Sequence, residues 1–135
     1  MKFLLLVIAL SAGIAAGFAG DRWLLAQPQP VRRTVLLEKD LAEAPGKEVD
    51  VFLIEMAPGA STGRHSHPGT EIAYILEGSA AVDTGGGATV QHDGEVSYLA
   101  PNQAHNVSNP SATGPLKAIV FAIYDKDKPK ITPAK

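Results

Sequence analysis

The most informative stretch of this 135-residue sequence is GASTGRHSHPGTEIAYILEG, which runs from Gly59 to Gly78. His65 and His67 are two residues apart, so in an extended strand both imidazoles project from the same face. Glu71 follows a Pro-Gly-Thr turn and begins an apolar, β-prone segment. A tight turn at this point would bring the carboxylate back beside the two rings. These three side chains are therefore candidate ligands for one metal ion.

A fourth candidate ligand, His105, lies far along the chain from the other three. A closed barrel could bring it to them. Three imidazoles and one carboxylate suit a single divalent transition metal ion, whether Fe, Mn, Ni, Zn or Cu. Such a set leaves one or two coordination positions for water or substrate. A lone His-x-His pair is also common in ordinary loops, and we interpret His92, beside an Asp-Gly turn, as a solvated surface residue.

Short apolar segments separated by turn residues indicate the fold class. The 13 glycines and 10 prolines break the chain at close intervals, and no helical period persists after residue 26. About eight or nine short strands at this spacing predict an all-β sandwich or barrel. The predicted strands are 34–37, 49–56, 63–67, 71–77, 80–83, 88–91, 95–100, 104–108 and 116–124, of which 80–83 and 88–91 form a hairpin.

Two segments of the sequence resemble the two motifs of the cupin family. The first motif is matched at each named position by the five residues Gly59, His65, His67, Glu71 and Gly78. The resemblance covers about residues 49–124, and the short spacer between the motifs, residues 79–93, is similar to that of small bacterial cupins.

The second motif spans residues 94–109 and contains His105. It departs from the family pattern in two places, because its proline comes one position late, at Pro101, and Gln103 stands in the region of its usual glycine. The resemblance implies a single jelly-roll β-barrel of six to eight strands with the metal inside. It also implies that the metal ligands are His65, His67, Glu71 and His105.

We divide the chain into four parts. Residues 1–26 are a signal peptide or N-terminal membrane anchor, and residues 27–46 are a linker and N-terminal strand. Residues 47–125 are the cupin domain, and residues 126–135, which are charged and contain proline, are a flexible tail.

The N-terminal part is an apolar leader helix. Lys2 precedes an apolar run over residues 3–20, as in a secretory signal, and cleavage after Ala26 would leave a polar mature start. The alternative is an uncleaved anchor, because this run nearly reaches the roughly 20 residues that span a bilayer. In both cases we expect the domain to be exported, either periplasmic or secreted, or else anchored and facing the periplasm.

Charge and composition limit the partners. The net charge is −2 and no basic run appears, so we predict no nucleic-acid partner and membrane contact only through the N-terminal segment. The chain has no cysteine, which excludes disulfides and zinc–thiolate sites. Resemblance to small cupins leads us to expect a homodimer that pairs across a sheet surface.

The function predicted from the complete ligand set is that of a metal-dependent enzyme acting on a small molecule, with a dioxygenase-type reaction. The alternative that the sequence leaves open is a non-catalytic periplasmic module that binds a metal or a small ligand. It is motivated by the lack of a clear acid–base group beyond the ligands. A sugar isomerase or epimerase fits less well, since such relatives do without the metal. We interpret Tyr74, Tyr98 and Tyr124 as core or barrel-wall residues.

Overall fold

The fold is given by a computed structural model that describes residues 30–135. All the regular secondary structure of this part is β-strand, so the predicted all-β class is confirmed there. The predicted leader of residues 1–26, with its export signal, lies outside the described residues. The strands are β1 (Val31–Asp40), β2 (Lys47–Met56), β3 (His65–Ser66), β4 (Gly69–Glu77), β5 (Ser79–Asp83), β6 (Ala88–His92), β7 (Val96–Leu99), β8 (Asn106–Ser108), β9 (Leu116–Asp125) and β10 (Thr132–Pro133).

Within residues 30–135, no helix has the length and apolar character needed to cross a membrane.

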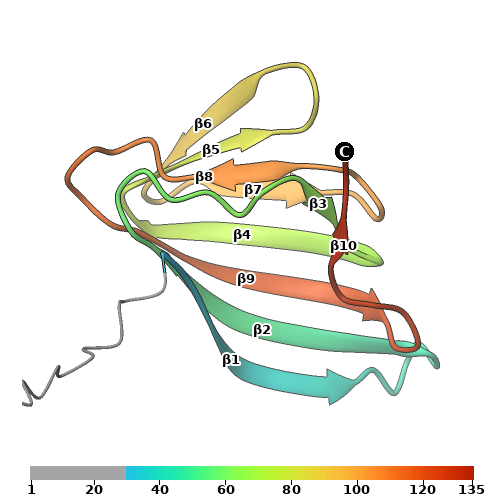
Figure 1. The fold of residues 1–135 in the computed structure, drawn as a ribbon. Coiled ribbons are helices and arrows are strands. Elements are labelled where there is room, and N and C mark those ends of the chain that lie inside the picture. Colours follow the sequence, from blue (N-terminus) through green and yellow to red (C-terminus); the bar gives the residue numbers. More distant parts are fainter. Residues whose placement is uncertain (1–29) are drawn as a thin grey trace, which may run out of the picture.

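The larger layer is a five-stranded antiparallel sheet with the strand order β1-β2-β9-β4-β7 (Figure 1). Its strands alternate because successive side chains point to opposite faces. In β9 every second side chain from Leu116 to Tyr124 is buried, whereas Phe121 and Ile123 between them are exposed on the outer face. One face of this sheet therefore supplies half of the barrel interior.

The smaller layer contains the strands β6-β5-β8, which are also antiparallel. Isolated bridges from Ser61 to Ser108 and from His65 to His105 join β3 and the segment before it to this sheet and to the residue before β8. Strand β10 then pairs with β3 on the other side. The second layer thus continues through β3 to the C-terminal end of the chain, and Figure 1 shows β10 beside β3.

An apolar core and a cavity lie between the two layers. Met56, Ile75 and Leu116 are at most 1% exposed and belong to one packed cluster. Other inward positions of the central strands carry small side chains, such as Ala73 and Ala118, which leave space beside this cluster. The result is a cavity of about 710 Å³ whose walls come from both layers.

The structure agrees with the predicted hairpin, since β5 and β6 pair over their whole length. It differs from the prediction near the N-terminal end, where residues 31–33 belong to β1 and not to a linker. They pair with residues 54–56 of β2. Hydrogen bonds to a neighbouring strand decide where a strand begins. The sequence of a proline-containing segment does not show which strand it will pair with.

The C-terminal end also differs from the sequence-based expectation. The sequence predicts a flexible tail over residues 126–135, but the structure shows this segment paired and hydrogen-bonded to the barrel. The backbone N–H of Lys126 donates to the carbonyl of Gly46 at 3.0 Å, and that of Ala134 donates to the carbonyl of Arg64 at 3.0 Å. A charged, proline-containing composition favours solvation, but here the edge of β3 offers the segment unpaired backbone groups.

Candidate metal centre

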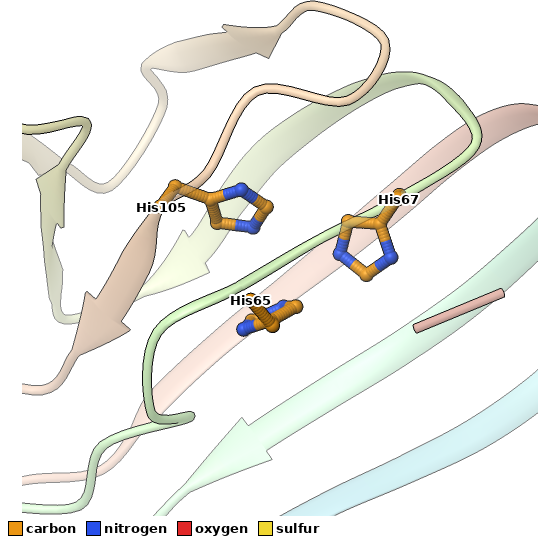
Figure 2. Close-up of side chains that lie close together, drawn as sticks. All are labelled: His65, His67 and His105. Carbon is orange, nitrogen blue, oxygen red and sulfur yellow. The ribbon is translucent and has the colours of Figure 1, made fainter. Parts of the chain in front are cut away.

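Strand register brings the three predicted histidine ligands together. His65 and His105 lie directly opposite each other and exchange both backbone hydrogen bonds, at 2.9 and 2.8 Å. His67 follows two residues after His65, and its ring centroid lies 4.7 Å from that of His65 and 5.1 Å from that of His105. One ring nitrogen from each residue lies within 4.8 Å of the other two. Figure 2 shows the three rings turned toward a common space.

The other ring nitrogen of each histidine is held by the backbone. A carbonyl oxygen can only accept a hydrogen bond, so each Nδ1 carries a hydrogen, and in the neutral ring Nε2 then keeps its lone pair. This is the tautomer that metal-binding histidines adopt when a neighbouring carbonyl orients them. The Nδ1–H groups donate from His65 to Gly63 O at 2.7 Å, from His105 to Gln103 O at 2.9 Å and from His67 to Lys130 O at 2.6 Å.

Three ring nitrogens that lie this close together can bind one positive ion. His105 is 2% exposed and His67 is 8% exposed, so water access is restricted at both rings. Burial lowers the pKa of His67 and of His105 below the usual histidine value, which keeps both rings neutral near pH 7. Neutral imidazoles are the form that ligates divalent transition metals. The donor set therefore fits such an ion.

Glu71, the fourth predicted ligand, lies next to the three-histidine cluster and is not one of its three members. Its Oε1 lies 3.4 Å from Nε2 of His67 and accepts a hydrogen bond from the hydroxyl of Tyr124. Burial raises the pKa of the Glu71 carboxyl, although the hydrogen bond from Tyr124 acts in the opposite direction. A bare ring nitrogen and a carboxylate oxygen at this distance would both be satisfied by a shared cation.

Tyr124 is buried in the barrel wall, as its prediction as a core or wall residue requires, and it also belongs to the site. Its ring stacks on His67 with centroids 5.7 Å apart. Burial, followed by the neighbouring Glu71, raises the pKa of its hydroxyl above the usual tyrosine value, so Tyr124 is a hydrogen-bond donor at neutral pH. Tyr124 occupies one of the alternate positions of β9 that face inward, and this alternation could be read from the sequence as a sign of burial. No local sequence pattern indicated the contact with Glu71. The carbonyl of Lys130 had no sequence signal at all.

The two departures from the family pattern do not displace His105. Asn102 adopts a positive φ of 59° in the turn, a conformation that asparagine tolerates better than most residues. Its backbone N–H donates to the carbonyl of His67 at 2.8 Å. The Gln103 side chain accepts from the backbone N–H of Ala100 at 3.0 Å, which closes the turn that precedes His105. Asparagine and glutamine therefore build this turn without the usual glycine.

The cavity changes character along the strands of the large sheet. At one end the inward row contains Asp50 and Glu71, which lie at the level of Ala122 of β9. One step further the row contains Phe52 and Val120, and the next rows are aliphatic up to Met56 and Leu116. The site is therefore a polar, histidine-bearing end that opens into an apolar chamber.

Comparison with known proteins identifies this architecture. Residues 52–122 match the cupin domain family, Cupin_2. A Cupin 2 conserved barrel domain protein from Salinispora arenicola CNS-205 is 28% identical, with a TM-score of 0.57 over 71% of this chain and 76% of that chain. A cupin superfamily protein from Desulfitobacterium hafniense DCB-2 is 18% identical, with a TM-score of 0.60 over 70% of this chain and 78% of that chain.

A third similar structure is the DMSP lyase DddQ from Ruegeria pomeroyi DSS-3, which is 19% identical, with a TM-score of 0.63 over 85% of this chain and 57% of that chain. At such identities the likeness concerns the fold alone. No curated protein matches the chain.

Proposed function

From the premise that this chain belongs to the Cupin_2 family of cupin domains, we propose that it binds one divalent transition metal ion and acts on a small molecule in its cavity. The ligands are His65, His67 and His105, with Glu71 as the fourth. The proposal depends on one observation. All three Nδ1–H groups are bound to carbonyls, so three Nε2 lone pairs are left to converge in the barrel.

A bound ion would supply Lewis-acid polarisation of a substrate oxygen and, if it is redox-active, electrons for chemistry with dioxygen. The residues of the chain hold and shield that centre. The backbone carbonyls orient the three rings, and Tyr124 donates to Glu71. Apolar walls that include Phe52 and Val120 line the adjoining chamber, and a less polar surrounding strengthens electrostatic interactions.

For the reaction class we propose a dioxygenase-type oxidoreductase. Three nitrogens and one oxygen leave coordination positions open, as catalytic sites require. The chamber, at about 710 Å³, falls within the range of small-molecule pockets, which is about 300–1,000 Å³. The substrate would thus place an oxygen-bearing group at the histidines and an apolar body against Phe52 and its aliphatic neighbours.

The alternative function is a non-catalytic module that captures a metal or a small ligand. One observation favours it, because the acid–base groups around the described cavity are already engaged with each other. Glu71 is bound to Tyr124, and Lys130 is paired with three carboxylates. In either function we propose export to the periplasm or beyond, since residues 1–26 have the composition of a signal peptide or an anchor.

Metal titration of purified full-length protein tests the ligand assignment. We expect one Zn²⁺, Ni²⁺ or Mn²⁺ per chain, and we expect His105→Ala to weaken binding by at least tenfold because a direct ligand is lost. His92→Ala is the matched control. His92 is exposed and its imidazole forms a hydrogen bond with the Ser79 hydroxyl, away from the three-histidine cluster, so its loss should leave the affinity unchanged. Equal affinities for the two variants would contradict the assignment.

Oxygen uptake separates the two functions. We would load the protein with Fe²⁺ or Ni²⁺ and incubate it aerobically with a panel of enolic and phenolic compounds. Uptake that requires both metal and substrate supports the dioxygenase-type reaction. Saturable ligand binding by calorimetry, with no uptake across the panel, supports the binding module.

A further inference from the structure

We propose that residues 126–134 form a strap that completes the metal centre and closes one side of the cavity, with Lys130 as its positioning residue. This inference rests on the proposed metal-binding function. It extends that function to a segment that belongs to neither cupin motif.

The three histidines differ in where their orienting carbonyls come from. His65 and His105 each donate to the carbonyl of the residue two positions earlier, so a local turn holds each ring. His67 instead donates to the carbonyl of Lys130, which lies 63 residues away. The tautomer and orientation of His67 therefore depend on a segment that is joined to the site only through tertiary contacts.

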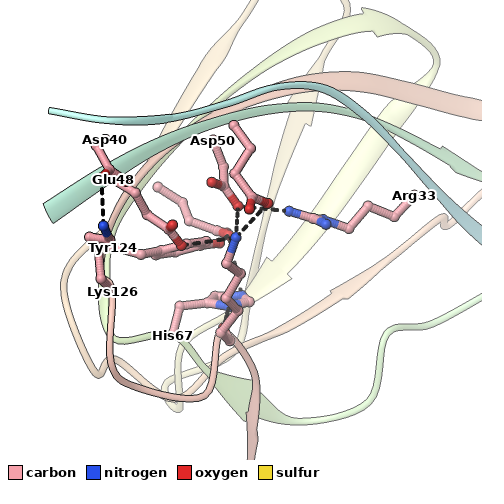
Figure 3. A network of polar contacts seen from close by, with 10 residues as sticks. Arg33, Asp40, Glu48, Asp50, His67, Tyr124 and Lys126 are labelled. Carbon is pink, nitrogen blue, oxygen red and sulfur yellow. Dashed lines mark hydrogen bonds and ion pairs between the residues drawn. The ribbon is translucent and has the colours of Figure 1, made fainter.

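A partly buried group of ion pairs holds this segment in place (Figure 3). The ammonium of Lys130 lies 2.8 Å from Asp50, 2.9 Å from Glu48 and 2.8 Å from Glu38. Asp50 is 0% exposed and Glu48 is 8% exposed, and both point inward from β2. A buried carboxylate without a cationic partner is costly, and the only other cation on Asp50 among residues 30–135 is Arg33, at 3.2 Å. The inner acids of β2 thus bind the strap strongly at the residue whose carbonyl holds His67.

The strap also forms part of the cavity wall. Lys130, Ile131 and Pro133 line the cavity beside the histidines. Beyond them β10 pairs with β3, which carries His65, and the N–H of Ala134 donates to the carbonyl of Arg64. Release of the strap would therefore remove the partner of His67 and open this side of the cavity in one step.

Charge-removing variants of the full-length chain test the strap. Lys130→Met keeps the backbone carbonyl and most of the side-chain volume but removes the ammonium. Because this change alone leaves the buried Asp50 carboxylate without its lysine partner, a second variant combines Lys130→Met with Asp50→Asn and so removes both charges. Lys126→Met is the matched control, since that lysine lies on the same strap but pairs with the exposed Asp40.

Three measurements are made on each variant. Hydrogen exchange at the Ala134 N–H reports whether the strap is attached, and the ¹⁵N shifts of the His67 ring report its tautomer. Competition titration with a chelator gives the affinity for Zn²⁺. For the double variant we expect faster exchange at Ala134, a mixed tautomer of His67 and Zn²⁺ affinity lower by about 10–100-fold, the usual effect of losing a group that orients a ligand. We expect Lys126→Met to behave as the unmodified protein.

The outcomes separate this inference from the proposed function. If the unmodified protein binds Zn²⁺ and the double variant releases the strap without any change in affinity, the strap inference is overturned and the metal site stands. Unchanged exchange at Ala134 in the double variant would likewise show that Lys130 does not hold the strap. Failure of the unmodified protein to bind Zn²⁺, Ni²⁺ or Mn²⁺ would overturn the proposed function itself.

Discussion

The hydrogen bond between Tyr124 and Glu71 joins the barrel wall to the candidate metal centre. Tyr124 is 1% exposed, and its hydroxyl has Glu71 as its partner. A buried carboxylate needs hydrogen-bond donors, because transfer from water without them is costly. The bond also sets the side of the carboxylate that faces His67, whose Nε2 lies 3.4 Å from Oε1. The hydroxyl of Tyr124 thus contributes both to the stability of the fold and to the orientation of Glu71, a candidate ligand.

We predict that Tyr124→Phe destabilises the metal-free protein by about 1–3 kcal/mol, because a buried acceptor loses its donor. Urea denaturation followed by circular dichroism measures this change in the free energy of unfolding. Tyr98→Phe is the control, since the Tyr98 side chain is 62% exposed and its change should have little effect. Equal stabilities of the two variants would show that the hydroxyl of Tyr124 contributes nothing at its buried position.

Among the strands, the pairing of β4 with β9 is unusually close at the start of β4. A Cβ atom at Gly69 would lie 1.8 Å from the carbonyl oxygen of Ile123, so no side chain fits between the two backbones. Glycine within a strand often marks such a close approach. This glycine lies between His67 and Glu71, so the close contact falls within the segment that carries two of the candidate ligands.

We predict that Gly69→Ala destabilises the domain by about 3 kcal/mol, the upper end of the usual cost of overpacking, because the contact is with backbone and cannot relax by a rotamer change. Thermal or urea unfolding measures the loss. Gly86→Ala is the control, since a Cβ there would meet nothing within 4 Å. A Gly69→Ala protein as stable as Gly86→Ala would show that β4 and β9 can separate freely.

Over the whole molecule, the central part of the outer face of the large sheet is apolar, and several of its large side chains are exposed among residues 30–135. Two neighbouring rows of apolar side chains cross four strands. At the β7 end of these rows, Val96 is 58% exposed and Tyr98 is 62% exposed. Contiguous apolar patches larger than a few hundred Å² mark interaction sites. The register places Val51, Phe121, Ile72 and Tyr98 in one row and Leu53, Ile119, Tyr74 and Val96 in the other.

A second copy of the chain is the partner we expect on this face, because two uncharged rows can pair with themselves about a two-fold axis. We predict a dimer by light scattering after gel filtration, and we predict that Tyr98→Glu converts it to a monomer by placing a charge in the interface. Val90→Glu, at a position 45% exposed on β6 of the other sheet, should leave the dimer intact. A monomeric unmodified protein at about 100 µM, well above the micromolar dissociation constants of many standard interfaces, would contradict the expected homodimer.

The sequence by itself determined the class of fold, and it named the candidate ligands and the turns around them. Two histidines at strand spacing, a turn before Glu71 and short strands separated by glycine and proline are local features, and local spacing limits which neighbours share a face. The resemblance to cupins over residues 49–124 supported His105 as the fourth candidate, since no local pattern links it to the other three. The fold class and the candidate ligands could therefore be predicted without knowing which distant strands pair.

Tertiary structure alone decided which groups complete the site. The register of β3 against the segment before β8 places His65 opposite His105, the packing of β9 against β4 brings Tyr124 to Glu71, and the return of the chain to β3 brings Lys130 to His67. The last two contacts join residues 53 and 63 positions apart in the chain. The energies of these contacts depend on burial and on the pairing of distant backbone groups. Neither property can be read from composition or local spacing.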